Sequence, residues 1–538
     1  MLLRFATEGC TRAPREIQVS QPTMPPEPTR TSGALTVTVG IALSRLFGFL
    51  RQAVVAHVLG VGPVADAVVA AFRIGNVAQN LVGEGTISAA LVPDYVKTRS
   101  EHGDASATEL ARGALGALIL ATTALSALGM LLAAPLTTVF AAGISGDARA
   151  LAVRLTVLAF PMTALLVLSA WALAILSANK RFLVAYTAPI VWSLAQIVAI
   201  GLAAWVFSGS GDALAEWLML GATVGAALQL LILMAPARRL IGRVSPLFSF
   251  SSPRLRETLR KVPSTLLGRG VMQLSGLIDT SLVTLVGAGA LSSFQYAQTA
   301  YLLPMALLGT GEAAVLLPAL SGQLSGERRP LRETMGPALL RVVALGSATA
   351  MVFIVFAPEV IAVLFQRGAF GEGTKLAVAP VLAMYGVGLL SNAVGRMMST
   401  ACYSAGDNTT VGRYAIVRVV VSTAGSLALM KVLGVPGVVL GAVLGGTVEA
   451  GLLLRRTHAH YGETGLGAVP WMKIALACGL AALVGVGARM LLGRVAPGLG
   501  ATLPLLHGLV ILAAAGVAVL GMFQVLGVLR VSRLLRRR

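Results

Sequence analysis

Long apolar runs fill most of the chain, and short breaks of glycine, proline or charged residues separate them. Each run reaches the length of about 18 residues that an α-helix needs to cross the hydrocarbon core of a bilayer. The pattern predicts an all-α polytopic membrane protein with about fourteen transmembrane helices. We expect the spans at residues 34–59, 65–93, 110–141, 150–176, 183–208, 213–236, 261–287, 292–320, 337–366, 376–403, 411–433, 436–454, 470–493 and 501–529.

Ionisable side chains interrupt the first two predicted helices. They are Arg45, Arg51, Asp66, Arg73 and Glu84. Each costs about 2.5–3.5 kcal/mol to insert at the centre of a helix, so such groups normally face a protein interior or a watery cavity. Arg45 and Arg51 differ by about 120° around the first helix, so they share a cavity only if it wraps that helix or Gly48 bends it.

The polar residues of the second predicted helix gather on one side. At about 100° and 1.5 Å per residue, they form a stripe roughly 60° wide and roughly 27 Å long. The stripe consists of Asp66, Arg73, Asn80 and Glu84. Salt bridges that pair helices would be the simpler explanation, but a stripe that crosses the whole hydrocarbon core is more typical of a transport path.

Short segments recur at a lag of about 224 residues: Leu-Ser-Arg at 43–45 matches Leu-Gly-Arg at 267–269. The lag covers six predicted helices, an even number, so both halves have the same orientation. Such parallel repeats are related by an axis along the membrane normal, and the substrate site lies between them. The repeat maps Arg45 onto Arg269, which either enters the same cavity or lies at the end of its helix and reaches out to the interface. Asp279 lies deeper than Arg269 in the predicted helix at 261–287. Arg396 lies within the predicted helix at 376–403.

The repeat and the loops divide the chain into segments. We predict a disordered tail at 1–33, an N-lobe of six helices at 34–237, a basic loop at 238–260, a C-lobe of six helices at 261–455, two appended helices at 470–530 and a basic tail at 531–538. Lys and Arg concentrate in the loops on one side, which predicts that both termini are cytoplasmic.

Composition agrees with this interpretation. The 538 residues are 56% hydrophobic and only 12% charged, which excludes an ordinary soluble protein. The net charge of +20 is explained by the Lys and Arg residues of the cytoplasmic loops, so it does not indicate nucleic-acid binding. The three cysteines are widely separated, and no pattern resembles a catalytic carboxylate pair or a Ser/His/Asp triad. We therefore expect no enzyme activity and no cofactor.

Several segments resemble the MurJ/MviN family, within the multidrug/oligosaccharidyl-lipid/polysaccharide exporter superfamily. They are S-R-L-F-G-F-L-R at 44–51, D-A-V-V-A-A-F-R-I-G-N at 66–76, G-E-G-T-I-S-A-A-L-V-P at 83–93, L-P-M-A-L-L-G and L-L-P-A-L-S within 303–321, L-F-Q-R-G-A-F at 364–370 and Y-S-A-G-D-N-T-T at 403–410. The resemblance runs from about Gly33 to the C-terminus. It implies a flippase that moves lipid II, the undecaprenyl-linked peptidoglycan precursor, from the inner to the outer leaflet of the cytoplasmic membrane by alternating access.

The resemblance also suggests site residues. Arg45 and Arg51 match two arginines of the family's central cavity, and Asp66 and Glu84 match acidic positions that pair with them at a gate. Two family cations are missing, because their positions fall at Asn80 and Thr299. Arg73 and Arg269 could compensate, since arginine binds pyrophosphate through bidentate, charge-assisted hydrogen bonds.

Some members of the family hold a sodium ion. The matching positions are Asp279, Asp407, Val419 through its carbonyl, and Thr423. Oxygen ligands of this kind suit a hard cation, and coupling to sodium or to protons is the corresponding expectation. The alternative for Asp407 is a turn residue.

Other functions remain open at this point. A flippase for another polyprenyl-linked glycan is the main alternative, and a non-transporting membrane scaffold for cell-wall synthesis is another. A drug/cation antiporter of the same superfamily would need an acidic cavity, which Arg45 and Arg51 disfavour. The expected partners are lipid II, membrane lipids and cell-wall synthesis proteins, with no nucleic acid.

Overall fold

The structure is a computed structural model that describes residues 31–206, 211–242, 245–248, 252–306, 308, 331–496 and 498–529. Within these ranges it does not describe the side chains of residues 31–39, 84–86, 88–89, 263–272, 274, 499 and 501. Most of the expected N-terminal tail and the whole basic C-terminal tail lie outside the described residues.

The described chain is built from helices, as the apolar pattern predicts. The first half contains α1 (Thr31–Leu59), α2 (Pro63–Val82), α3 (Glu84–Leu131), α4 (Ala133–Phe140), α5 (Gly146–Ala178), α6 (Phe182–Thr187), α7 (Pro189–Val206) and α8 (Gly211–Ile241). The second half contains α9 (Pro253–Thr284), α10 (Ala290–Met305), α12 (Leu331–Val355), α13 (Ala357–Phe365), α14 (Glu372–Ser404), α15 (Asn408–Leu433) and α16 (Val435–Tyr461). After them come a 3₁₀ turn (Leu466–Ala468), α17 (Trp471–Val495), α18 (Leu499–Thr502) and α19 (Pro504–Val525).

The two halves pack their helices in the same order. In the first, α3 packs on α5, and α5 and α7 pack on α8; in the second, α12 packs on α14, and α14 and α15 pack on α16. Each half is therefore a lobe, called here the N-lobe (α1–α8) and the C-lobe (α9–α16). Each has an apolar core, and that of the C-lobe continues into α17 and α19. Arg489 of α17 ties this appended pair to the C-lobe through an ion pair with Glu359 of α13 at 2.6 Å.

Eleven described helices are long and apolar enough to cross a membrane. The expected total of fourteen stays a prediction, because α2, α9 and α10 do not meet this criterion over their described residues. α10 has only 16 residues, and α2 carries polar side chains such as Arg73 and Asn80.

The second predicted helix is not continuous. Gly83 ends α2 with φ −84° and ψ −134°, a backbone conformation outside the helical region, and α3 starts at the next residue. The prediction of one straight helix over 65–93 is therefore wrong, and the stripe from Asp66 to Glu84 is broken at Gly83. A second break follows at Gly103, where φ is +80° inside α3. This left-handed conformation is one that glycine adopts readily.

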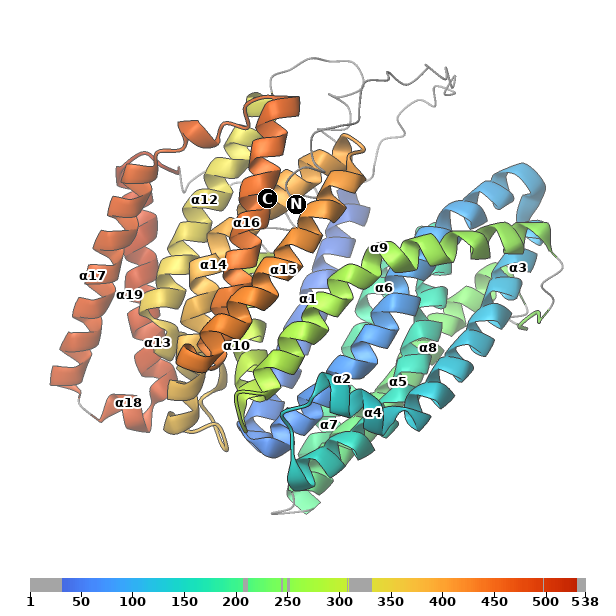
Figure 1. The fold of residues 1–538 in the computed structure, drawn as a ribbon, viewed down its shortest axis with the longest axis horizontal. Coiled ribbons are helices and arrows are strands. Elements are labelled where there is room, and N and C mark those ends of the chain that lie inside the picture. Colours follow the sequence, from blue (N-terminus) through green and yellow to red (C-terminus); the bar gives the residue numbers. More distant parts are fainter. Residues whose placement is uncertain are drawn as a thin grey trace, which may run out of the picture.

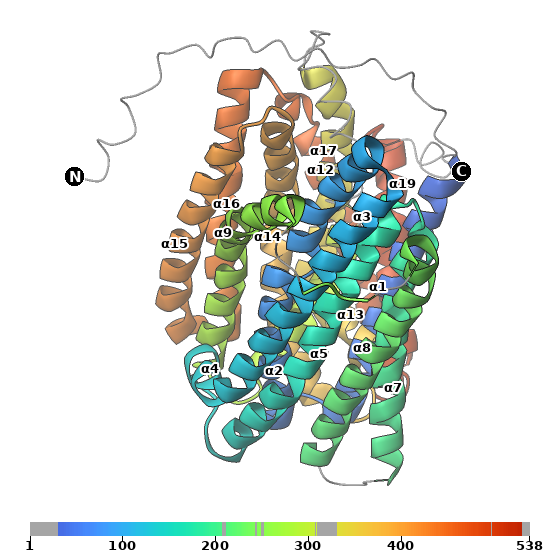
Figure 2. The same ribbon diagram turned by 90° about the vertical axis from the view of Figure 1, so that its right-hand side faces the viewer.

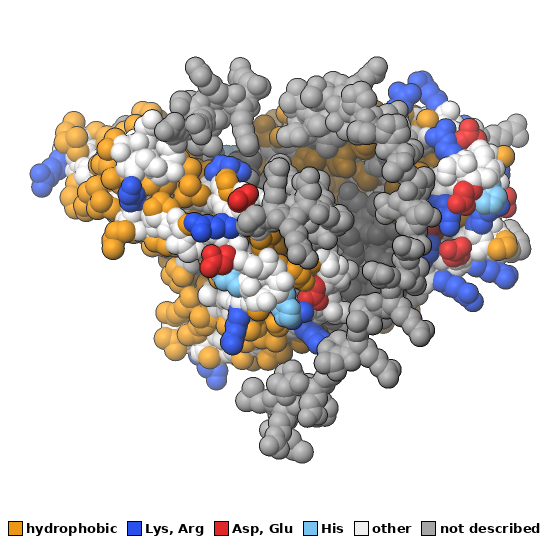
Figure 3. All heavy atoms as spheres, turned by 90° about the horizontal axis from the view of Figure 1, so that it is seen from above, with side chains coloured by type: hydrophobic (Ala, Val, Ile, Leu, Met, Phe, Trp, Pro, Cys, Tyr) orange, Lys and Arg blue, Asp and Glu red, His pale blue; other side chains and the backbone are white. Residues whose placement is uncertain are grey.

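The lobes meet at one end and diverge toward the other (Figures 1 and 2). We call the meeting point the closed end; it carries the α1–α2, α4–α5, α9–α10 and α13–α14 connections. The opposite end, where α8 ends and α12 begins, is called the open end. Seen from the open end, the space-filling surface is hollowed between the lobes, and Lys and Arg side chains lie on the ends of both lobes (Figure 3).

Candidate binding cavity

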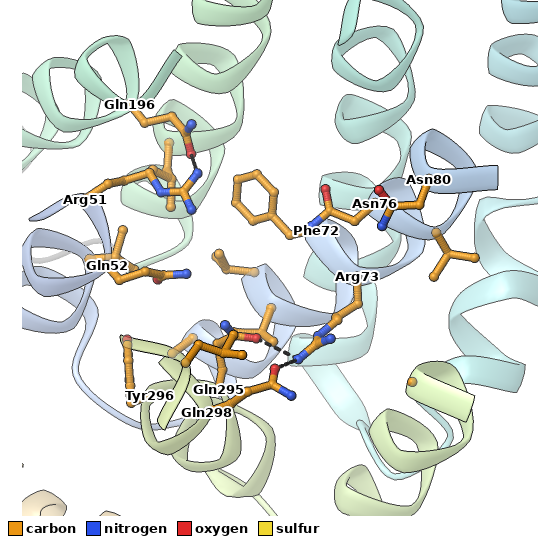
Figure 4. A pocket seen from close by; sticks show the side chains of 18 of the residues that line it. Arg51, Gln52, Phe72, Arg73, Asn76, Asn80, Gln196, Gln295, Tyr296 and Gln298 are labelled. Atoms are coloured by element: carbon orange, nitrogen blue, oxygen red, sulfur yellow. Dashed lines mark hydrogen bonds between the residues drawn. The ribbon is translucent and has the colours of Figure 1, made fainter. Parts of the chain in front are cut away.

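A cavity of about 300 Å³ lies between the lobes. Its walls come from α1, α2, α7 and α8 of the N-lobe and from α9 and α10 of the C-lobe. Two arginines and seven amide side chains supply its polar lining, most of them labelled in Figure 4. They are Arg51, Arg73, Gln52, Asn76, Asn80, Gln196, Gln273, Gln295 and Gln298. The remaining wall is mostly apolar and aromatic.

Arg51 enters the cavity from α1 on the N-lobe side. Its guanidinium lies over the ring of Trp192, 4.6 Å from the centroid, and its Nη1 donates to Oε1 of Gln196 at 3.4 Å. Both partners belong to α7, so packing between α1 and α7 fixes the position of this charge. Stacking on an aromatic face leaves the outer donors of an arginine available to a ligand.

Arg73 reaches across the cavity from α2 to α10. Its Nη2 donates to Oε1 of Gln295 at 3.1 Å and also to Oε1 of Gln298. The side chain therefore joins the two lobes, as the dashed lines of Figure 4 show. Asp279 of α9 lies near enough to interact with Arg73 electrostatically.

The lining suits an anionic, hydroxyl-rich ligand. Among the described residues that line the cavity, two are cations and none is a carboxylate. Guanidinium groups donate charge-assisted hydrogen bonds to phosphate oxygens, and amides both donate to and accept from sugar or peptide groups. A cavity of this kind does not suit an organic cation, because two arginines line it and none of its described lining residues is a carboxylate.

The closed end is held by Asp66 of α2. Its carboxylate accepts hydrogen bonds from the backbone N–H groups of Gly289 and Ser292 at 2.6 and 2.7 Å, and from the Ser292 hydroxyl at 2.7 Å. Gly289 is the N-cap of α10, so Asp66 satisfies the free amides at the start of a helix in the other lobe. Asp66 is only 3% exposed and does not line the cavity.

Further contacts between the lobes gather at the same end. The Tyr296 hydroxyl donates to the carbonyl of Gly60 at 3.0 Å, and the N–H of Ala369 donates to the carbonyl of His57 at 2.8 Å. Gly143 approaches α9 so closely that an added Cβ would lie 1.8 Å from the carbonyl oxygen of Thr284. The cavity is therefore shut off on this side.

The structure separates some residues that the sequence grouped. Asn80 lines the cavity, where its Nδ2 donates to Gln273 at 3.4 Å. Arg45 lines a different pocket of about 220 Å³, formed by α1, α2, α5, α6, α7 and α8 within the N-lobe, because α1 continues through Gly48. Thr299 donates to the carbonyl of Gln295 on its own helix at 2.8 Å. The side chains of Glu84 and Arg269 lie outside those that the structure describes.

The four residues expected to bind sodium do not come together. Asp407 is the N-cap of α15, where it accepts from the N–H of Thr410 at 3.3 Å and pairs with Arg456 at 3.1 Å. Val419 and Thr423 lie further along the same uninterrupted helix. The rise of about 1.5 Å per residue puts them about 18 and 24 Å from Asp407, too far for one ion. Among the described residues no group of three or more His, Cys, Asp or Glu could hold a metal.

Sequence reasoning missed most of the amides that line the cavity. Gln196, Gln273, Gln295 and Gln298 come from four places on α7, α9 and α10. Gln196 and Gln273 are each the single glutamine of a predicted span, and Gln295 and Gln298 lie three residues apart on α10 but carry no charge, so a stripe of charged residues does not reveal them. The available signal was the presence of uncharged polar residues at membrane depth, which are costly unless they have partners.

Comparisons with known proteins agree with this architecture. A family model described as lipid II flippase MurJ matches residues 55–525. A probable lipid II flippase MurJ of Rhizobium tropici is 31% identical over 425 residues, which cover 77% of this chain and 78% of the relative. The lipid II flippase MurJ of Burkholderia cenocepacia is 28% identical over 464 residues, which cover 84% of this chain and 88% of the relative.

Solved structures show the same fold. A lipid II flippase MurJ in an inward closed conformation superposes with a TM-score of 0.74 at 20% identity, over 91% of this chain and 98% of that one. A multidrug resistance MATE family transporter in an inward-facing conformation gives a TM-score of 0.62 at 18% identity, over 82% of this chain and 98% of that one. At these identities the structural likeness concerns the fold alone.

Proposed function

The chain belongs to the MurJ family of lipid II flippases, and from this membership we propose that it moves lipid II between the leaflets of the bacterial cytoplasmic membrane. The single observation that carries the proposal beyond family membership is the cationic, amide-rich lining of the cavity between the lobes. Lipid II has a pyrophosphate and a sugar-peptide head group, so its anionic part needs arginines and its glycan and peptide need amides.

The transport cycle follows from the closed and open ends. The basic open end faces the cytoplasm, in line with the positive-inside rule. Lipid II enters from the inner leaflet, its pyrophosphate binds Arg51 and Arg73, and its polyprenyl tail stays in the bilayer. Breaking the contacts of Asp66 with α10 then opens the opposite end, while the lobes approach each other on the cytoplasmic side.

Arg73 couples binding to this movement. Its bonds to Gln295 and Gln298 join α2 to α10 only while the guanidinium has no better acceptor. A pyrophosphate accepts charge-assisted hydrogen bonds that are stronger than those to an amide oxygen. Arrival of the ligand therefore competes with an interlobe contact and lowers the cost of moving the lobes. The driving ion, sodium or proton, stays a prediction.

Depletion of the protein in its host tests the proposal. Loss of a flippase should deplete lipid II from the outer leaflet and make it accumulate in the inner leaflet, measured by labelling surface-exposed lipid II in intact cells. Unchanged outer-leaflet lipid II in depleted cells, with no second family member expressed, would contradict it. Accumulation of a different polyprenyl-linked glycan would instead identify that glycan as the substrate.

A further inference from the structure

The C-lobe contains charged residues that the cavity described above does not include. Arg396 lies on α14, Arg418 on α15 and Glu449 on α16. Arg396 is eight residues before the end of α14 and Arg418 is ten residues after the start of α15, which places them about 12 and 15 Å inside the same end of the bundle. Arginines at one depth within spans are costly in lipid, so they mark a watery surface.

The two arginines differ in how their charges are balanced. Arg418 donates from Nη1 to Oε2 of Glu449 at 3.1 Å, and the Glu449 side chain is 15% exposed. This pair is close to neutral. Arg396 is exposed and forms no ion pair with a described residue. Arg418 also interacts electrostatically with Asp279 of α9, so its charge is balanced by two carboxylates, whereas that of Arg396 is balanced by none among the described residues.

The cluster adjoins the cavity through two tyrosines. Arg396 and Arg418 both lie near enough to Tyr301 of α10 to interact with it electrostatically. The Tyr301 ring stacks on that of Tyr385, with centroids 4.8 Å apart, and Tyr385 forms a hydrogen bond with Gln298. Gln298 is also a partner of Arg73 in the cavity. A continuous polar wall thus leads from the cavity into the C-lobe.

We propose that Arg396 is a binding residue for the pyrophosphate of the substrate, on the C-lobe side of the path. This inference rests on the proposed function. A pyrophosphate diester carries about two negative charges, one on each phosphate. Among the described residues, Arg51 and Arg396 are the arginines on this path without a nearby carboxylate, whereas Arg73 faces Asp279 and Arg418 faces Glu449. Arg396 lies nearer the open end than Arg51, so a substrate that enters there meets Arg396 before it reaches the cavity.

Binding measurements on purified full-length protein test this role. The probes are undecaprenyl pyrophosphate and undecaprenyl monophosphate, with affinity measured by native mass spectrometry in detergent. Arg396→Ala should weaken binding of the pyrophosphate lipid at least about 10-fold, because a charge-assisted hydrogen bond is lost. The loss should be smaller for the monophosphate lipid, and Arg396→Lys should restore part of the affinity. Arg413→Ala, which removes an exposed arginine near the start of α15, is the matched control and should bind as the parent does.

Glu449→Gln provides a test in the opposite direction. It removes one of the two carboxylates that balance Arg418 and so makes the cluster more positive, and binding of the pyrophosphate lipid should become several-fold tighter, a gain that misfolding cannot produce. Parent-like affinity in both Arg396→Ala and Glu449→Gln would overturn the role of Arg396 while leaving the proposed function intact. A parent protein that binds neither lipid would overturn both.

Discussion

Replacing Asp66 with asparagine should open the closed end of the molecule. In the parent, one carboxylate accepts three hydrogen bonds of 2.6–2.7 Å from Gly289 and Ser292 at the start of α10. Asparagine keeps a single acceptor oxygen, so it loses the bond from Gly289 and the negative charge that complements the positive end of the helix dipole.

The size of the effect follows from these contacts. A hydrogen bond to a charged group contributes about 1.5–3 kcal/mol, and a charge at a helix N-terminus contributes about 0.3–1 kcal/mol. Water replaces part of both when the end opens, so we expect a net loss of about 2–3 kcal/mol. The ratio of open to closed molecules should then rise about 30–150-fold, since about 1.4 kcal/mol corresponds to tenfold.

Pulsed electron paramagnetic resonance can measure this ratio. Spin labels introduced through Trp205→Cys in the N-lobe and Val432→Cys in the C-lobe report the separation of the lobes at the closed end, because both positions are exposed there. Cys10, Cys402 and Cys478 are first replaced with alanine.

Asp66→Asn should shift the distance distribution toward longer separations. Asp104→Asn is the matched control, because Asp104 pairs with Arg99 at 2.6 Å within α3 of the N-lobe and makes no contact with the closed end. Identical distributions in the parent and Asp66→Asn would refute the assignment of Asp66 as the residue that holds this end together.

Three further predictions test other parts of the account. Gly143→Val should shift the same distances as Asp66→Asn without changing any charge, because the added Cβ would overlap the carbonyl of Thr284. An unshifted distribution would mean that the backbone around Gly143 moves to relieve the overlap while the lobes stay together. Burial raises the pKa of Asp407, but hydrogen bonds from Thr410 and Arg456 outweigh burial and hold the pKa below its ordinary value. A lowered pKa means that the stabilisation is present at neutral pH and is lost as pH falls through the folded-state value. Asp407→Ala should thus cost about 1–2 kcal/mol at pH 7, as a lower thermal midpoint, and much less in acid; an equal difference at both pH values would contradict this. Asn80→Arg should tighten binding of undecaprenyl pyrophosphate about 10-fold by adding a cation to the cavity lining, and unchanged affinity would show that the pyrophosphate lies elsewhere.

The fold could be predicted from local features. Apolar runs long enough to cross a bilayer and a repeat at a fixed lag were sufficient for two lobes of transmembrane helices, because an apolar run lies within one helix and a repeat is visible when the chain is compared with itself. The positions of Arg51 and Arg73 in a cavity also followed from the cost of charge at membrane depth.

The details of the site depend on contacts between distant helices. Asp66 is a charged residue on α2, like Arg73 of the cavity. It nevertheless binds the start of α10, more than 220 residues away along the chain. Gly83 breaks the stripe through its backbone conformation, which the apolar pattern does not encode. Asp407 belongs to a turn held by Arg456, which the motif alone could not distinguish from an ion ligand.

The central claim is that the cavity between the lobes carries the substrate across the membrane. The most direct test is flipping of fluorescent lipid II in liposomes that contain the purified protein, comparing the parent with Arg51→Ala, Arg73→Ala and a surface control, Arg154→Ala. Arg154 pairs with Asp212 and Glu216 on the exposed side of the N-lobe. We expect flipping by the parent and by Arg154→Ala, and at least a tenfold loss in both cavity variants. Parent-like flipping by Arg51→Ala and Arg73→Ala would contradict the account.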